Sequence, residues 1–445
     1  MTAELTHRND RTGTGTAGEH ATAGPPVAET LAPAFRTLLN GPPPLTIEFW
    51  DGSRIDADGP NMLRFNSPRA IRQIVWSPDE LGLARAFVTG DLDAVGNVAV
   101  ILRSLQTSIQ RDPRAVARAI PAVIAAGRSI GALGSRPRRP DEERLPRGVR
   151  HTLRRDREVI SHHYDVGNDF YELVLGPAMT YSCARFASAT TNLEDAQSAK
   201  HELICRKLGL HEHRDERARL LDVGCGWGSM AIHAATHHDV DVVGITISTE
   251  QADFARRRVH DLGLADRVDI RVQDYREIDD GPFDVISSVG MAEHVGIKRM
   301  EEYFERLYSL LVPGGRLLNH AIASTGGSRL SRRSFIYRYV FPDSELLDIA
   351  DTARFMEAAG FEVRDVENLR EHYATTLRHW VANLERHWTA AVELVGEARA
   401  RVWLLYMSGS INGFDDGGIQ LMQTLGVRLA ADGASGMPRT RADWR

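Results

Sequence analysis

The carboxyl-terminal part of the sequence alternates short apolar runs, rich in β-branched residues, with longer amphipathic segments. This alternation constrains the fold most, because strands separated by helices form βαβ crossovers, which build a mostly parallel sheet covered on both faces. The runs that predict strands are residues 220–223, 240–246, 268–272, 283–288, 316–321 and 361–366. We therefore predict a doubly wound α/β domain that binds its ligand at the carboxyl ends of the strands.

The rest of the chain predicts a second, smaller domain. At about 150 residues per domain, the 445 residues are enough for two or three domains. Apolar alternation at 45–50 indicates a strand, and helical periodicity marks 68–76 and 98–110. The predicted boundaries are 1–28 for a disordered tail, 29–127 for an α+β domain, 128–157 for a linker and 158–445 for the α/β domain.

The predicted linker is rich in arginine. Its arginines outnumber its acidic residues. The arginines are Arg136, Arg138, Arg139, Arg144, Arg147, Arg150, Arg154 and Arg155. The acidic residues are Asp141, Glu142, Glu143 and Asp156. Two interpretations stay open. The segment is a solvated connector, or it contacts anionic lipid, where each basic residue near the surface contributes about 1 kcal/mol.

Composition excludes several classes of protein. Lys and Arg number 54 against 60 Asp and Glu, a net charge of −6, so the whole molecule is not a polycation that binds nucleic acid. The three cysteines have no spacing typical of a disulfide framework or a zinc site, and we predict no metal. No apolar window reaches the roughly 18 residues of a membrane span, and the N-terminus lacks a secretory pattern. We expect a cytoplasmic protein that touches the inner face of the membrane.

The strongest local motif is LLDVGCGWG at residues 220–228, an apolar strand followed by glycines and a predicted helix at 229–235. Glycines let the backbone approach a ligand, and the helix amino end offers unpaired N–H groups. The spacing GxGxG is not the dinucleotide GxGxxG, and no P-loop lysine follows. The motif favours S-adenosylmethionine over NAD or ATP, although alone it also fits a mere tight turn.

The next two predicted strands end in suitable polar residues. Thr246 and Gln251 can bind ribose hydroxyls without charge, at the place where many such domains have an acid. Asp274 follows the third strand, where it can accept a hydrogen bond from an adenine amino group. Three consecutive strand ends with this chemistry are hard to explain as accidents of loop sequence.

Several motifs in the α/β domain resemble the cyclopropane-fatty-acid synthase family, including the mycolic acid cyclopropane synthases, over about residues 158–427. They are HYDVGNDFY at 163–171, MTYSCA at 179–184, the glycine loop, VGMAEHVG at 289–296, NHAI at 319–322 and HYATTL at 372–377. The resemblance implies a Rossmann-like class I S-adenosylmethionine-dependent methyltransferase fold. Residues 81–93 look like the extra amino-terminal domain of the bacterial phospholipid enzymes.

The resemblance also implies two sets of site residues. One set would hold S-adenosylmethionine: Tyr164, Tyr181, Ser182, Gly224, Gly226, Thr246, Ile247, Gln251, Asp274 and Tyr275. The other would hold a bicarbonate ion beside the sulfonium: Cys183, Glu293, His320, Tyr373 and the backbone N–H of Ile322.

The implied reaction is methyl transfer to the cis double bond of an unsaturated acyl chain, with phospholipid as the expected substrate. An alkene is a poor nucleophile, so the site must be dry and well aligned. Tyr181 or Trp380 can stabilise the carbocation by cation–π attraction. Bound bicarbonate then removes a proton from the added methyl group, which closes a cyclopropane ring. A hydride shift followed by loss of a methyl proton instead gives an exomethylene group, the precursor of a methyl branch.

Alternatives of other classes are a small-molecule O- or N-methyltransferase and a lipid-binding protein that has lost catalysis. Both are disfavoured, because neither explains the presence of both sets of site residues. A homodimer is an expectation from the resemblance alone.

The sequence departs from the family pattern at three places, and we expect these differences to change the shape of the acyl channel rather than methyl transfer. They are Arg185, the turn at 341–345, and Asp415 with Asp416.

The remaining histidines and cysteines have ordinary interpretations. We predict surface positions for His211, His213, His237 and His238, a core position for Cys205, and no chemical role for Cys225 beyond its small size.

Overall fold

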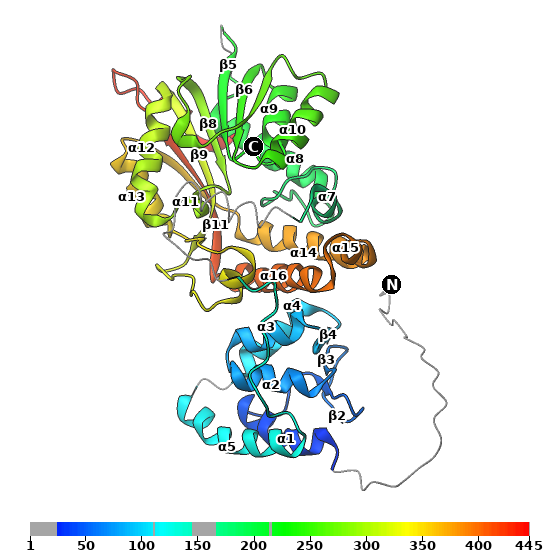
Figure 1. Cartoon of the computed structure of the whole chain (residues 1–445). Coiled ribbons are helices and arrows are strands. Elements are labelled where there is room, and N and C mark those ends of the chain that lie inside the picture. The colour runs from blue at the N-terminus through cyan, green and yellow to red at the C-terminus, as the bar shows by residue number, and fades with distance from the viewer. Residues whose placement is uncertain (1–24, 110–111, 145–165, 213–215, 445) are drawn as a thin grey trace.

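The computed structural model describes residues 25–109, 112–144, 166–212 and 216–444, which form two units (Figure 1). The N-terminal unit has a small sheet of strand order β2-β1-β3-β4. Its strands are β1 (Thr46–Glu48), β2 (Arg54–Ile55), β3 (Met62–Phe65) and β4 (Leu92–Val95). Its helices are α1 (Val27–Leu38), α2 (Pro68–Trp76), α3 (Glu80–Val88), α4 (Val98–Ser108) and α5 (Pro113–Ser129).

The larger unit contains a seven-stranded sheet of order β10-β11-β9-β8-β5-β6-β7. Its strands are β5 (Ala218–Val223), β6 (Val240–Thr246), β7 (Val268–Val272), β8 (Phe283–Val289), β9 (Leu311–Ser324), β10 (Glu362–Asn368) and β11 (Ile419–Val427). Strands β5 to β9 pair in parallel, whereas β11 pairs antiparallel with both β9 and β10. The six predicted strands are confirmed, and β11 is an additional one.

Helices cover both faces of this sheet, and further helices continue toward the N-terminal unit (Figure 1). They are α7 (Asn168–Leu175), α8 (Leu193–Leu208), α9 (Ser229–His237), α10 (Thr249–Asp261), α11 (Ala292–Val295), α12 (Met300–Leu310), α13 (Ile349–Ala358), α14 (Arg370–Arg386), α15 (Trp388–Val395) and α16 (Glu397–Asp415). The shorter helices are η1 (Tyr275–Glu277), η2 (Ile297–Arg299), η3 (Ile336–Val340) and η4 (Arg441–Trp444). The doubly wound α/β fold is confirmed.

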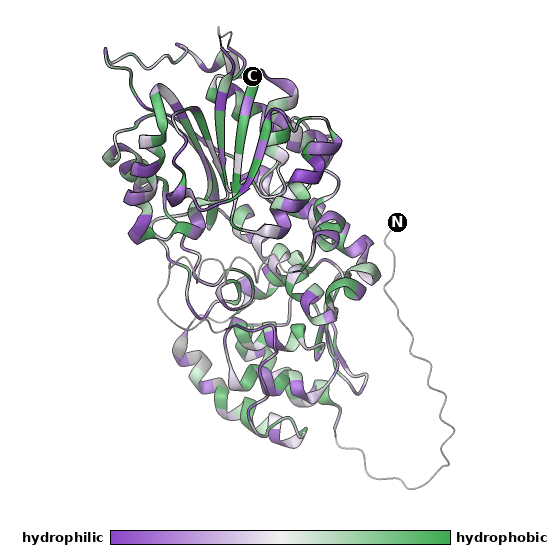
Figure 2. Cartoon of the chain, turned by 45° about the horizontal axis from the view of Figure 1, so that its top comes forward, coloured by the Kyte–Doolittle hydropathy of each residue, from purple (hydrophilic) through white to green (hydrophobic). Residues whose placement is uncertain are grey.

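The central strands are buried because their side chains are apolar on both faces, as a parallel sheet between helix layers requires. Figure 2 shows hydrophobic residues concentrated along these strands and hydrophilic residues on the outer sides of the helices. Gly244 shows how tightly the layers pack, because a Cβ there would lie 2.8 Å from Ile270 and 3.2 Å from Cys225.

The N-terminal unit docks on α16 through α3 and α4, and the two units share one hydrophobic core. Asn412 donates a hydrogen bond to the carbonyl of Ala99 at 2.9 Å. Arg401 pairs with Asp93 at 2.7 Å. Asp415 pairs with Arg103 at 3.0 Å, so one of the acids that departs from the family pattern fastens the two units together.

Part of the arginine-rich segment is docked rather than freely solvated. The Glu143 carboxylate is fully buried and receives two hydrogen bonds from Arg85, at 2.7 and 2.9 Å. Arg338 lies 3.5 Å from the same carboxylate. The second half of the predicted linker lies outside the described residues, as do residues 1–24 of the predicted tail.

Within the described ranges, none of the helices combines the length and apolarity that crossing a membrane would require.

Candidate functional site

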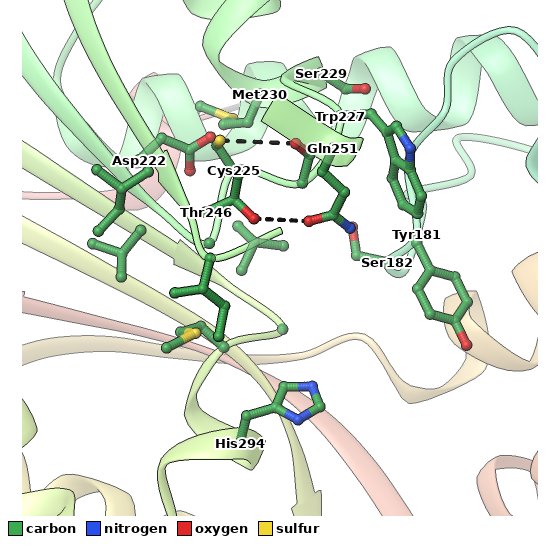
Figure 3. A pocket seen from close by; sticks show the side chains of 18 of the residues that line it. Tyr181, Ser182, Asp222, Cys225, Trp227, Ser229, Met230, Thr246, Gln251 and His294 are labelled. Atoms are coloured by element: carbon green, nitrogen blue, oxygen red, sulfur yellow. Dashed lines mark hydrogen bonds between the residues drawn. The ribbon is translucent and has the colours of Figure 1, made fainter. Parts of the chain in front are cut away.

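A pocket opens at the carboxyl ends of β5, β6 and β7, where the fold predicts a ligand (Figure 3). Most residues predicted to bind S-adenosylmethionine line it: Tyr181, Ser182, Gly224, Gly226, Thr246, Ile247, Gln251, Asp274 and Tyr275. Tyr164 lies outside the described residues. One cavity therefore collects side chains that are spread over almost one hundred positions of the sequence.

The glycine loop forms the floor of this pocket. Gly224 has a φ of 77°, which is the left-handed conformation that glycine adopts without strain. The N–H groups of Gly224 and Cys225 both donate to the carbonyl of Ile245, at 3.0 and 2.9 Å. The loop is thus anchored to β6, and α9 begins directly after it at Ser229, so a helix amino end faces the pocket.

The end of β6 supplies a neutral polar pair. The hydroxyl of Thr246 donates to Gln251 Oε1 at 2.8 Å, and both side chains are buried (Figure 3). The Ser248 hydroxyl accepts from the N–H of Gln251 and caps α10. This cap fixes the first turn of α10 and so presents the Gln251 amide to the pocket.

The end of β7 places Asp274 and Tyr275 at the pocket wall. The Asp274 carboxylate accepts from Arg276 Nε at 2.7 Å and Nη2 at 2.8 Å, which fixes its orientation. Tyr275 packs edge-on against Tyr303, with ring centroids 4.9 Å apart. Burial raises the pKa of Tyr275 to about 12, so its hydroxyl stays protonated.

Four of the residues predicted to hold bicarbonate are buried, and the fifth, Ile322, is half-buried and lies in direct contact with Glu293. Glu293, at the start of α11, accepts a 2.7 Å hydrogen bond from the N–H of Ile322 on β9. Glu293 Oε2 is buried without a hydrogen-bond partner among the described residues. Burial raises the pKa of Glu293 to about 7, although the bond from Ile322 acts to lower it.

His320 lies two residues before Ile322 on β9 and is 1% exposed. Its Nδ1 is 3.2 Å from Gln423 Nε2 on the adjacent β11. His320 Nε2 has no hydrogen-bond partner in the described parts of the chain. Burial holds the pKa of His320 well below its usual value, so the ring is neutral. With Nδ1 accepting from the amide, the ring proton is on Nε2.

Cys183 and Tyr373 complete the predicted set. Cys183 is fully buried, and its thiol contacts the carbonyls of Ala184 at 3.1 Å and Leu369 at 3.7 Å. Burial raises the pKa of this thiol, which therefore stays protonated. Tyr373 lies on α14, in the turn after Leu369, with its ring 4.6 Å from that of Phe414.

Aromatic rings pack around Tyr181, one of the residues that line the pocket. Tyr181 has its ring centroid 5.4 Å from Trp380 and 5.8 Å from Trp403, and its hydroxyl donates to Tyr406 at 3.1 Å. Tyr171 packs against Tyr181 at 5.6 Å. The predicted cation-stabilising residues Tyr181 and Trp380 are therefore in contact within a largely apolar environment.

The turn at 341–345, which departs from the family pattern, supports Glu293. The N–H of Glu345 donates to the Glu293 carbonyl at 3.1 Å, and the Glu345 carboxylate accepts from Ile297 at 2.9 Å. Asp343 adopts a left-handed φ of 70° and accepts from the Tyr337 hydroxyl at 2.9 Å. An aspartate tolerates this conformation better than most residues.

The structure adds three buried polar residues that the sequence analysis did not identify. Lys200 and Asp222 line the pocket at the ends of β5, β6 and β7. Gln423 contacts His320. Asp222 lies two positions before Gly224 of the glycine loop, and this place in the motif could have indicated that it is a site residue. Lys200 lies in an amphipathic helix, where lysine normally indicates a solvated face.

The histidines outside the pocket differ from one another. Surface positions are confirmed for His211 and His237, and His213 lies outside the described residues. The surface prediction is wrong for His238, whose side chain is only 8% exposed because it bonds to Glu202 at 3.0 Å. Cys205 is in the core as predicted, and with Glu202 and His238 it forms a group of metal-ligand type.

Comparison with known proteins extends these observations. The family model for mycolic acid cyclopropane synthetase matches residues 151–424, more than half of the chain. A probable fatty acid methyltransferase of Mycobacterium tuberculosis is 41% identical over 411 residues, covering 89% of this chain and 94% of the relative. The cyclopropane-fatty-acyl-phospholipid synthase of Escherichia coli K12 is 38% identical over 275 residues, covering 62% of this chain and 69% of that enzyme.

Solved structures are similar to a large part of this chain. The cyclopropane synthase MmaA2 of Mycobacterium tuberculosis has a TM-score of 0.57 and 32% identity, covering 61% of this chain and 98% of that structure. The mycolic acid cyclopropane synthase CmaA1, solved in complex with SAH and CTAB, has the same TM-score, identity and coverage.

Proposed function

Because the chain belongs to the mycolic acid cyclopropane synthetase family and is an S-adenosylmethionine-dependent methyltransferase of lipid acyl chains, we propose that it converts cis double bonds of phospholipid acyl chains to cyclopropanes. S-adenosylmethionine supplies the methyl group that becomes the ring carbon. The described pocket residues fit this cofactor, since neutral Thr246 and Gln251 suit ribose hydroxyls and Asp274 suits an adenine amino group.

The observation that carries the proposal is a pair of buried polar atoms, Glu293 Oε2 and His320 Nε2, that have no hydrogen-bond partner among the described residues. A heteroatom methyltransferase has no need of such a pair, because its acceptor brings its own lone pair. Buried polar groups are normally hydrogen-bonded, so the two atoms favour a small polar ligand. Bicarbonate fits, because His320 donates through Nε2 while Glu293 donates or accepts according to its protonation.

Bound bicarbonate would supply the base that takes a proton from the newly added methyl group. The chain's own residues position and protect this chemistry. Ile322 fixes Glu293 through its N–H, and Gln423 fixes the His320 tautomer. The Tyr181 and Trp380 rings exclude water and offer cation–π stabilisation of about 0.5–2 kcal/mol to the carbocation.

Membrane contact is the second part of the proposal. Helix α5 lies on the outer side of the N-terminal unit, away from the large sheet (Figure 1). Arg114, Arg118 and Arg128 on α5 are exposed. At about 100° per residue they fall within about 80° of the helix circumference, and we name them the basic face. A basic face of this kind attracts anionic phospholipid, which would bring the acyl chains to the enzyme.

The test is mass spectrometry with gas-chromatographic separation of fatty esters, after purified protein is incubated with S-adenosylmethionine and oleoyl phospholipid. We expect a gain of one CH2 with loss of the alkene. The same gain with an exomethylene alkene in place of the ring would establish the methylene route to a methyl branch. No gain with phospholipid, free acid or acyl thioester would overturn acyl-chain methylation by this chain.

A further inference from the structure

Lys200 is a buried cation in the cofactor pocket, and nothing above gives it a role. It lies on α8 and is 1% exposed. Its Nζ donates to the Ser182 hydroxyl at 2.9 Å, and both residues line the pocket. A lysine is almost never fully buried unless it is paired with an acid, so its position calls for a counter-charge.

Lys207 shows what such pairing looks like on the same helix. It is also 1% exposed, but its Nζ lies 3.0 Å from Asp365 and contacts Glu367 as well. Among the described residues, Lys200 has no carboxylate within 4.0 Å and bonds only to a neutral hydroxyl. Burial lowers the pKa of Lys200 to about 7, and the nearby Cys183 thiol and Asp222 carboxyl groups offset only part of that effect. The protein itself therefore leaves this ammonium under-compensated.

Asp222 is a buried anion in the same pocket. It is the penultimate residue of β5, two positions before Gly224, and is 1% exposed. Its Oδ1 accepts from the Ser287 hydroxyl at 2.7 Å, whereas Oδ2 is buried with no hydrogen-bond partner in the described ranges. Burial raises the pKa of Asp222 to about 6, although the bond from Ser287 and the charge of Lys200 act to lower it.

One buried cation and one buried anion in a single pocket match a ligand group that carries both charges. The α-amino acid end of S-adenosylmethionine is such a group, because it combines an ammonium and a carboxylate on one carbon. We propose that Lys200 binds the cofactor carboxylate and that Asp222 accepts from the cofactor ammonium, so that the two residues recognise the zwitterion. This assignment depends on the binding of S-adenosylmethionine. It does not depend on which acyl substrate is methylated or which product forms.

The test compares ligands that differ in this end alone, by isothermal titration calorimetry. S-adenosylhomocysteine carries the complete zwitterion, and 5′-methylthioadenosine lacks it. We expect Lys200→Met to weaken S-adenosylhomocysteine binding by about tenfold to a hundredfold, the range for a hydrogen bond to a charged group. The affinity of the Lys200→Met variant for 5′-methylthioadenosine should differ from that of the wild type by less than about twofold. Lys207→Met is the matched control and should not change the preference between the ligands.

Equal losses for both ligands would overturn the assignment, because they would mean that Lys200 only supports the shape of the pocket. Unchanged binding of S-adenosylhomocysteine would overturn it too. The wild-type protein gives a second measurement that no folding defect can obscure. It should bind S-adenosylhomocysteine at least about tenfold more tightly than 5′-deoxy-5′-(3-aminopropylthio)adenosine, which lacks only the carboxylate. Equal affinities would overturn the role of Lys200. These readouts do not depend on whether any acyl chain is methylated.

Discussion

At the scale of single residues, Glu293 is the side chain whose charge matters most for the proposed chemistry. Glu293→Gln keeps an acceptor for the Ile322 N–H but removes the negative charge. We expect turnover to fall at least about a hundredfold, as for loss of a group in proton transfer. Binding of S-adenosylhomocysteine should stay nearly unchanged. Product analysis measures the turnover, and calorimetry measures the affinity for S-adenosylhomocysteine. Glu357→Gln, an exposed change on α13, is the control.

The pH dependence of turnover tests the same residue. The pKa of Glu293 is raised to about 7, so the carboxylate protonates as the pH falls through that value. If the ionised form is needed, turnover rises with pH through about 7 in the wild type. The Glu293→Gln variant has no such group and should lose this rising limb. A limb that survives in the variant would assign the titration to a group other than Glu293.

The identities of most site residues could be predicted from the sequence, because each belongs to a short motif beside a strand end. The contacts between these residues could not be predicted from the sequence. Ile322 donates to Glu293 across 29 positions, and no periodicity specifies that contact. Lys200 was missed because its helix is amphipathic, and its burial depends on α8 packing over the sheet.

At the scale of elements, β11 is the strand that sequence analysis did not predict. Every residue from 421 to 427 is buried, so the strand lacks the alternation of a half-exposed one. It also follows a 19-residue helix and returns antiparallel between β9 and β10. The strands of the parallel part were predictable because each lies between two helices. The order of the strands depends on long-range pairing, which local sequence does not encode.

Strand β11 gives a prediction, because it places Gln423 opposite His320 in register. Gln423→Met removes the amide that fixes the ring tautomer while keeping the volume similar. We expect turnover to fall about tenfold, the effect of one hydrogen bond, with S-adenosylhomocysteine affinity unchanged. Gln420→Met, on the same strand, is the control. If Gln423→Met lowers ligand affinity as much as turnover, the residue supports the pocket rather than the histidine.

At the scale of the whole molecule, the docking of the two units depends on a few polar contacts around the shared core. Arg401 is 14% exposed, pairs with Asp93 and Glu397, and donates to the Phe87 carbonyl at 3.2 Å. Arg401→Met should lower the free energy of unfolding by about 2 kcal/mol, measured by urea denaturation. Arg354→Met, at an exposed ion pair with Asp351, should leave the midpoint nearly unchanged. Similar shifts for both variants would argue against a docking role.

The basic face of α5 allows a test of the membrane part of the proposal. We expect the protein to bind vesicles of anionic phospholipid at low salt and to dissociate as salt screens the attraction. Each arginine near the surface contributes about 1 kcal/mol, so combining Arg114→Glu, Arg118→Glu and Arg128→Glu should weaken binding at least about a hundredfold in sedimentation assays. Arg217→Glu with Arg354→Glu, on the larger unit, should have little effect. Binding that is insensitive to salt and equal in all three proteins would show that the basic face does not contact the bilayer.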